Sequence, residues 1–88
     1  MTRNAVSFKA IGARLRSSRV ELGFSLEKLA DHLAKSAGSR PSTAKLSRIE
    51  TGIQPVPTDI LSGLSELTGI PKSELRPDLV ALMRDAAE

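Results

Sequence analysis

The chain has 88 residues, and a chain of this length buries only roughly 60 to 65% of its extended surface, which supports one hydrophobic core. It contains no cysteine and one histidine, so disulfides, thiolate metal sites and most catalytic constellations are excluded. No apolar run approaches the length of a membrane span, and the first residues lack the apolar segment of a secretory signal. We therefore expect a cytoplasmic protein that has no membrane segment, needs no cofactor and is not an enzyme.

The net charge of +3 hides an uneven distribution of charge along the chain. Residues 1–48 contain ten basic and three acidic side chains, whereas residues 49–88 contain three basic and seven acidic ones. A basic half beside an acidic half indicates one face suited to a polyanion. Uneven composition of an ordinary solvated surface is the alternative that charge alone leaves open.

The first 35 residues predict two helices separated by a glycine. Apolar residues recur with helical spacing in the first helix, at Phe8, Ile11, Leu15 and Leu22. Gly23 supplies the left-handed residue that ends this helix, and Ser25 is an N-cap for a second helix that should run to about residue 35. The inward stripe of the second helix consists of Leu26, Leu29, Ala30 and Leu33.

The middle of the chain predicts a loop and a third helix. Segment 36–41 is polar, contains both glycine and proline, and breaks the helical periodicity. Ser42 or Thr43 can cap the third helix, which buries Leu46 and Ile49 and ends at Gly52.

The last third predicts an extended connector followed by two more helices. Residues 53–57 contain two prolines and cannot be helical, whereas Thr58 can cap a fourth helix that Gly69 ends. The inward residues of the fourth helix are Ile60, Leu61, Leu64 and Leu67. A short turn at 72–75 leads to Pro77, which begins a last helix, residues 77–88, with apolar residues Leu79, Val80, Leu82 and Met83.

No stretch alternates with the period of two that a strand requires. The fold class is therefore all-α, with about five helices in one domain that spans residues 1–88 and has its core within 8–70. Because the last helix carries more apolar surface than one inward stripe needs, we expect part of it to mediate dimerisation.

Three sequence motifs together resemble the phage Cro and lambda-repressor family of helix-turn-helix regulators, also called the Xre family. They are Ile11-Gly12-Ala13-Arg14-Leu15-Arg16 with Arg19 and Gly23-Phe24-Ser25, then Leu29-Ala30, then Leu46-Ser47-Arg48-Ile49-Glu50-Thr51-Gly52. The segment Leu75-Arg76-Pro77-Asp78-Leu79 also looks like the C-terminal signature of the YdaS-type Cro-like regulators. The resemblance implies a compact lambda-repressor-like domain whose third helix, residues 43–51, enters the DNA major groove.

The resemblance also implies roles for individual residues. Glu50 is expected to pair with Arg19 and so tie the third helix to the first. The groove-facing positions of the third helix are Thr43, Ala44, Ser47 and Arg48, with Ser42, Lys45 and Thr51 at its flanks. Arg48 is the best candidate base reader, because its planar fork can engage the major-groove edge of a guanine, although a phosphate contact is the open alternative.

Two features depart from the family pattern. Leu26 occupies the position where many members carry a glutamine that braces against a phosphate, so this role falls to Ser25 or Lys28. The turn between the second and third helices is also enlarged, with segment 36–41 adding about six residues to the family's usual spacing. Either the second helix is longer or the loop bulges. Lys35, Ser39 and Arg40 are candidate phosphate contacts, and a flexible surface insertion without a DNA contact is the alternative.

The sequence thus predicts a transcriptional regulator that binds double-stranded DNA, as a homodimer on an inverted repeat. A phage-type repressor and an autoregulating antitoxin with a toxin partner are both compatible with this prediction. The rival from another class is a protein-interaction module that bridges a transcription factor or polymerase without reading bases, and it would expose an apolar patch on the third helix.

Overall fold

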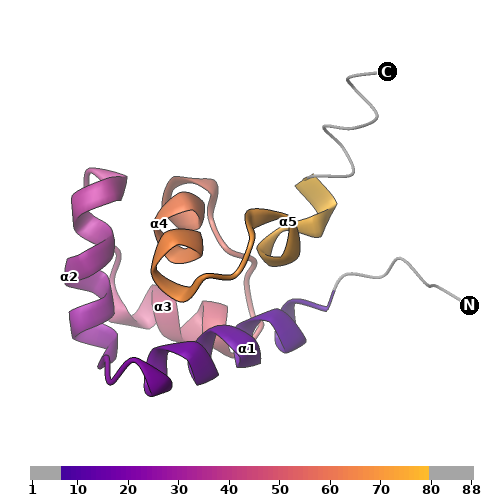
Figure 1. The fold of residues 1–88 in the computed structure, drawn as a ribbon, viewed down its shortest axis with the longest axis horizontal. Coiled ribbons are helices and arrows are strands. Elements are labelled where there is room, and N and C mark those ends of the chain that lie inside the picture. The colour runs from indigo at the N-terminus through magenta and orange to yellow at the C-terminus, as the bar shows by residue number, and fades with distance from the viewer. Residues whose placement is uncertain (1–6, 80–88) are drawn as a thin grey trace, which may run out of the picture.

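The computed structural model describes residues 7–79, and within this range the chain forms five helices and no strand. The helices are α1 (Phe8–Glu21), α2 (Leu26–Ala37), α3 (Thr43–Glu50), α4 (Thr58–Thr68) and α5 (Lys72–Leu75), and residues 77–79 are also helical. Figure 1 shows α1 along one side of the domain, α2 standing at its end, and α4 between α2 and α5. This arrangement confirms the all-α prediction.

Serine side chains define the start of the first three helices. The hydroxyl oxygens of Ser7, Ser25 and Ser42 each accept the backbone N–H three residues later, at 3.0 to 3.1 Å. This contact satisfies one of the donors that a helix N-terminus leaves unpaired. The prediction that Thr58 caps α4 is wrong, because Pro57 occupies the N-cap position, Thr58 is the first helical residue, and no side chain caps the end.

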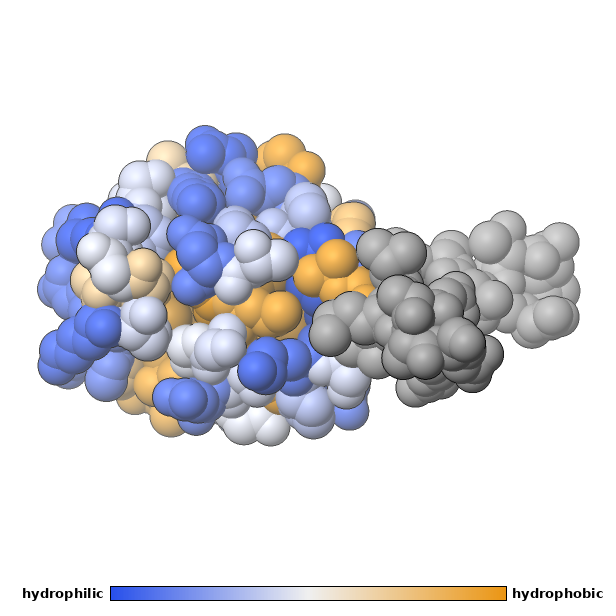
Figure 2. Space-filling model, turned by 90° about the horizontal axis from the view of Figure 1, so that it is seen from above, coloured by the Kyte–Doolittle hydropathy of each residue, from blue (hydrophilic) through white to orange (hydrophobic). Residues whose placement is uncertain are grey.

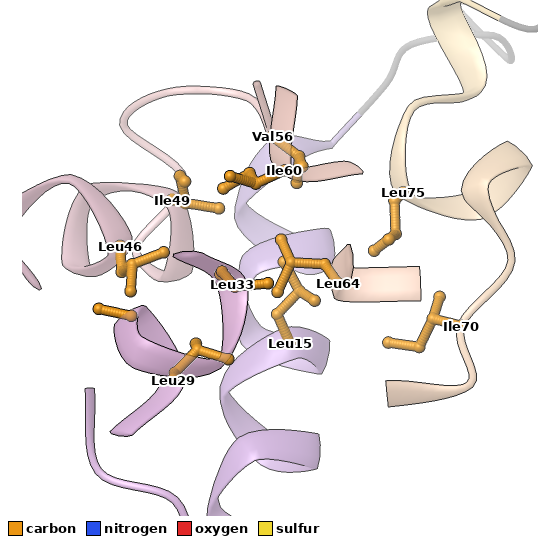
Figure 3. Packing of buried hydrophobic residues seen from close by; sticks show 11 residues of the cluster. Leu15, Leu29, Leu33, Leu46, Ile49, Val56, Ile60, Leu64, Ile70 and Leu75 are labelled. Atoms are coloured by element: carbon orange, nitrogen blue, oxygen red, sulfur yellow. The ribbon is translucent and has the colours of Figure 1, made fainter. Parts of the chain in front are cut away.

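A single core joins α1 to α5. Its buried side chains come from every helix and from the α3–α4 and α4–α5 connections, and in Figure 3 they point toward one another. They are Leu15, Leu29, Ala30, Leu33, Leu46, Ile49, Val56, Ile60, Leu64, Ile70 and Leu75. Burying one such leucine or isoleucine contributes about 1.5 to 3 kcal/mol, so this cluster is the main source of stability.

Three predictions about the elements need correction. Leu22 is 46% exposed, because it lies at the C-cap of α1, where the chain turns away from the core. α2 extends two residues beyond position 35, and the segment predicted as a turn at 72–75 is the short helix α5. The predicted C-terminal helix is described only at 77–79, so Val80, Leu82 and Met83 lie outside the described residues.

Two glycines bring α1 and the end of α3 into backbone contact. Gly12 is buried, and a Cβ atom at this position would overlap the carbonyl oxygens of Ile49 and Glu50. Gly52, just after α3, has φ of 82° and lies against the backbone of Lys9. Any side chain at either site would push α1 and α3 apart, so these glycines fix how α3 sits on the domain.

Two ion pairs hold α5 and the residues that follow it. Arg14 of α1 donates to Glu74, and both side chains are exposed. Arg76 donates to both carboxylate oxygens of Asp78 at 3.0 and 2.9 Å and to the carbonyl of Val56 at 2.6 Å.

Polar residues cover much of the face seen in Figure 2, with apolar residues showing in a strip between them.

Candidate nucleic-acid interface

The outer side of α3 presents a narrow polar face. Leu46 and Ile49 are buried against the core, whereas the exposed residues recur with helical spacing at Ala44, Ser47, Arg48 and Thr51. Thr43 and Lys45 flank this face and are half-buried, and Ser42 is exposed at the helix start. The face therefore offers hydroxyl groups, one guanidinium and one methyl group to a ligand that lies along the helix.

A largely buried ion pair fixes α3 to α1. The Nε and Nη2 atoms of Arg19 donate to the two carboxylate oxygens of Glu50 at 2.7 and 3.1 Å, and Nη1 donates to the carbonyl of Phe24 at 2.7 Å. The two side chains are only 13% and 7% exposed. The hydrogen bond to Glu50 raises the pKa of Arg19 above its ordinary value, against the opposing effect of burial. The pair that the resemblance implies is thus present.

Arg48 forms hydrogen bonds through both its side chain and its backbone. Its Nε atom donates to the side-chain oxygen of Gln54 at 3.1 Å, while its backbone carbonyl accepts the N–H of Ile53 at 2.9 Å. The Thr51 hydroxyl lies 3.0 Å from the carbonyl of Ser47 and 3.2 Å from that of Arg48. The end of α3 and the start of the connector therefore form one hydrogen-bonded unit. Sequence reasoning did not single out Gln54.

The start of α2 lies beside this unit, with an aromatic stack on its outer side. The rings of Phe24 and His32 stack with centroids 5.0 Å apart, and Lys28 Nζ lies 5.4 Å from the centroid of Phe24. Ser25 is exposed and caps the helix, which leaves its hydroxyl hydrogen free to donate. His32 is exposed on α2, and its stacking on Phe24 was not predicted from the sequence.

The additional residues between the second and third helices form a longer α2 and a short loop. Because α2 reaches Ala37, only residues 38–42 connect it to α3. Gly38 has φ of 81° and donates its N–H to Ala34, and Pro41 is buried. Arg40 donates to Asp31 of α2 at 2.7 Å, with side-chain exposures of 46% and 69%. Lys35 is also exposed on α2, so the loop region keeps basic groups at the surface.

An open hollow of about 390 Å³ adjoins the exposed face of α3. Arg16 of α1 lines one side of it, Leu26 lines another, and Ser47 and Thr51 border it from α3. The Arg19–Glu50 pair also lies in its lining. Sequence analysis did not connect Arg16 with α3, because periodicity along one helix carries no information on its neighbour.

Neither a cluster of metal-ligating side chains nor a membrane-spanning helix occurs in the residues that the structure describes. Residues 7–79 contain no group of three or more His, Cys, Asp or Glu side chains that could hold a metal ion. No helix in this part of the chain is both long and apolar enough to cross a membrane.

A helical domain that exposes a polar, partly basic helix, with a second helix packed behind it, has an arrangement that is typical of helical nucleic-acid-binding domains. The family model described as "Helix-turn-helix domain" matches residues 10–79. The chain therefore belongs to the helix-turn-helix domain family, a family that suggests DNA binding and generally lacks enzymatic activity. No curated protein and no solved structure shows significant similarity to the chain.

Proposed function

We propose that this protein is a sequence-specific regulator of transcription of the Cro and lambda-repressor type, which inserts α3 into the major groove of double-stranded DNA. The observation that carries the proposal is the exposed face of α3, which is polar and is held rigidly by the Arg19–Glu50 pair. An α-helix fits the width of the B-DNA major groove, where base edges display distinct donors and acceptors.

The side chains on α3 match the chemistry of base edges. The guanidinium of Arg48 can donate two hydrogen bonds to O6 and N7 of a guanine, and the methyl group of Ala44 can contact the methyl group of a thymine. Ser47 and Thr51 add hydroxyl groups next to these two residues. Arg48 is thus assigned to base reading in this proposal.

Backbone contacts come from the surrounding elements. The N-termini of α2 and α3, capped by Ser25 and Ser42, direct backbone N–H groups outward, and such helix ends favour phosphates. Basic side chains around the face extend this contact along the phosphate backbone on both sides of the groove. They are Arg16, Lys28, Lys35, Arg40 and Lys45.

A second copy completes the proposal. A homodimer would place two α3 helices in successive major grooves about one helical turn apart, so the operator would be an inverted repeat. Repression by occlusion of a promoter follows from this geometry, for a phage-type repressor and for an autoregulating antitoxin alike. A toxin gene adjacent to the gene for this protein would favour the antitoxin.

The rival function, a protein-interaction module, has less support. It requires a large apolar patch on α3, yet the large hydrophobic residues exposed in residues 7–79 are Val20, Leu22 and Ile53, none of which belongs to α3. Ala44 is the only apolar residue among the four on the exposed face of α3.

Selection of random DNA duplexes by the purified protein tests the proposal. We expect enrichment of one sequence made of two inverted half-sites whose centres lie about one helical turn apart. Enrichment of a single half-site would contradict the dimer, and retention of all duplexes alike would contradict base reading. Failure to retain any duplex would contradict DNA binding.

A pair of arginine variants provides the matched control. Arg48→Ala should weaken binding to the enriched duplex by about 1 to 3 kcal/mol, while binding to unrelated duplexes changes much less. Arg14→Ala removes another exposed arginine, which is engaged with Glu74, and it should change binding to neither the enriched nor the unrelated duplexes. An equal loss on both DNAs for Arg48→Ala would make Arg48 a phosphate contact.

A further inference from the structure

We infer that Gln54 is a positioning residue for Arg48, and that it determines how strictly the protein requires a guanine at the base pair that Arg48 reads. This inference rests on the proposed function and names a specificity determinant outside the recognition helix. It starts from the hydrogen bond between Arg48 Nε and the side-chain oxygen of Gln54, 3.1 Å long. Because Nε–H can only donate, the amide of Gln54 must turn its oxygen toward Arg48.

The backbone fixes Gln54 relative to Arg48. The N–H groups of Ile53 and Gln54 both point to the carbonyl of Arg48, at 2.9 and 3.4 Å. This turn depends on Gly52, whose positive φ and close approach to Lys9 leave no room for a side chain. Gln54 itself is half-buried, whereas Arg48 is exposed. The anchored partner in this hydrogen bond is therefore Gln54, and the mobile one is Arg48.

The hydrogen bond to Gln54 leaves one edge of the Arg48 guanidinium available to the ligand. An arginine can present either its Nε and Nη2 atoms or its two Nη atoms to a pair of acceptors. With Nε engaged by Gln54, the two Nη atoms are left for O6 and N7 of a guanine. Holding the side chain in this orientation before binding also lowers the rotamer entropy lost on contact. Loss of the Arg48–Gln54 hydrogen bond should therefore weaken discrimination between base pairs more than it weakens affinity for non-specific DNA.

Base preference at individual positions is the measurement that tests this inference. The duplex is the one selected by the wild-type protein, and the Arg48 position is the base pair whose preference Arg48→Ala abolishes. We expect Gln54→Ala to reduce the preference for guanine there by about threefold to tenfold, the value of one hydrogen bond, with other positions unchanged. Gln54→Glu keeps an oxygen acceptor, so it should retain the preference while its charge weakens binding to every duplex.

Two controls separate positioning from structure. Ile53→Ala changes the neighbouring residue, which is 72% exposed, and should leave every preference as in wild type. Combining Gln54→Ala with Arg48→Ala should produce no further loss at the Arg48 position, since the two residues act as a unit. Additive losses, or a uniform loss at all positions with Gln54→Ala, would overturn the inference.

A measurement without DNA keeps the inference testable on its own. In the free protein, the Nε–H of Arg48 should exchange with water more slowly in wild type than in Gln54→Ala, and Gln54→Glu should restore slow exchange. Equal exchange rates would overturn the inference even if the protein selects a DNA sequence. A protein that selects no DNA sequence but shows the expected exchange rates would instead contradict the proposed function.

Discussion

The two ends of α3 are secured in different ways, although each is attached by an ion pair with an N–O distance of 2.7 Å. At the C-terminal end the Arg19–Glu50 pair is 13% and 7% exposed, and Gly12 and Gly52 bring α1 into backbone contact. At the N-terminal end the Arg40–Asp31 pair is 46% and 69% exposed and secures a loop of five residues, 38–42. An equal distance therefore does not mean an equal contribution to stability.

Burial decides the difference between the two pairs. Removing one partner of a buried pair leaves an uncompensated charge, whereas an exposed pair competes with water and salt. The ion pair at the C-terminal end of α3 should therefore contribute more to stability than the one in the loop before α3. Four measurements, from the largest expected effect to the smallest, test this contrast.

Glu50→Ala should have the largest effect on stability. We expect the free energy of unfolding to fall by about 3 to 5 kcal/mol, because Arg19 remains partly buried without its partner. Denaturant unfolding followed by circular dichroism measures this change, since the chain has no Trp or Tyr to report by fluorescence. The double variant with Arg19→Met should recover part of the loss, and strictly additive effects would show that the residues do not interact.

Gly12→Ala should have the next largest effect. The new Cβ would overlap the carbonyl oxygens of Ile49 and Glu50, so α1 must shift at a cost of about 1 to 3 kcal/mol. Gly63→Ala is the matched control, because its Cβ would meet the side chains of Ser36 and Leu33 rather than backbone. A smaller loss for Gly12→Ala than for Gly63→Ala in the same unfolding assay would refute the close crossing of α1 and α3.

The Arg76–Asp78 pair has intermediate exposure, 13% and 37%, and should give a smaller effect that depends on pH. The hydrogen bond from Arg76 lowers the pKa of Asp78 below its ordinary value in the folded protein. The stability that ionised Asp78 contributes is therefore fully present above the pKa of this carboxyl in the unfolded chain, about 4. It is lost as the pH falls through the lower pKa of Asp78 in the folded protein.

Unfolding experiments at a series of pH values check this expectation. Asp78→Asn should destabilise the protein at neutral pH and should reduce the loss of stability on acidification. If the variant and the wild type lose stability equally between pH 5 and pH 2, Asp78 does not contribute in this way.

Arg40→Ala should have the smallest effect on stability, within about 1 kcal/mol, because both partners of its ion pair are exposed. Its effect should appear in DNA binding, where specific and non-specific affinities fall alike and the salt slope decreases by about 0.9, the value for one phosphate contact. Lys35→Ala should behave in the same way. An unchanged slope in both variants would mean that this region does not touch DNA.

Local sequence signals were sufficient for most of the fold. Gly23, Gly52 and Gly69, which were predicted to end helices, have positive φ. Ser25 caps α2 as predicted, and Ser42, one of two predicted candidates, caps α3. The errors occur where tertiary packing decides. Leu22 fits the apolar spacing of α1 but is exposed at its C-cap. The sequence left open whether α2 is longer or the loop bulges, and the structure has the longer helix.

The candidate site was predicted only in part for a similar reason. The exposed positions of α3 follow from the spacing of Leu46 and Ile49, and the Arg19–Glu50 pair was implied by family resemblance. Gln54 and Arg16 were missed, because their relation to α3 depends on how a connector and a neighbouring helix fold back on it. A single sequence carries no direct signal for such long-range contacts.

The stacked rings of Phe24 and His32 give the domain a natural spectroscopic reporter. Protons held over the face of an aromatic ring are shielded by its ring current, so the imidazole signals of the only histidine should be displaced upfield in the proton NMR spectrum. Phe24 also supplies the carbonyl that accepts a hydrogen bond from Arg19. Loosening of the corner between α1 and α2 can therefore be followed in one resolved signal, without a label and without DNA.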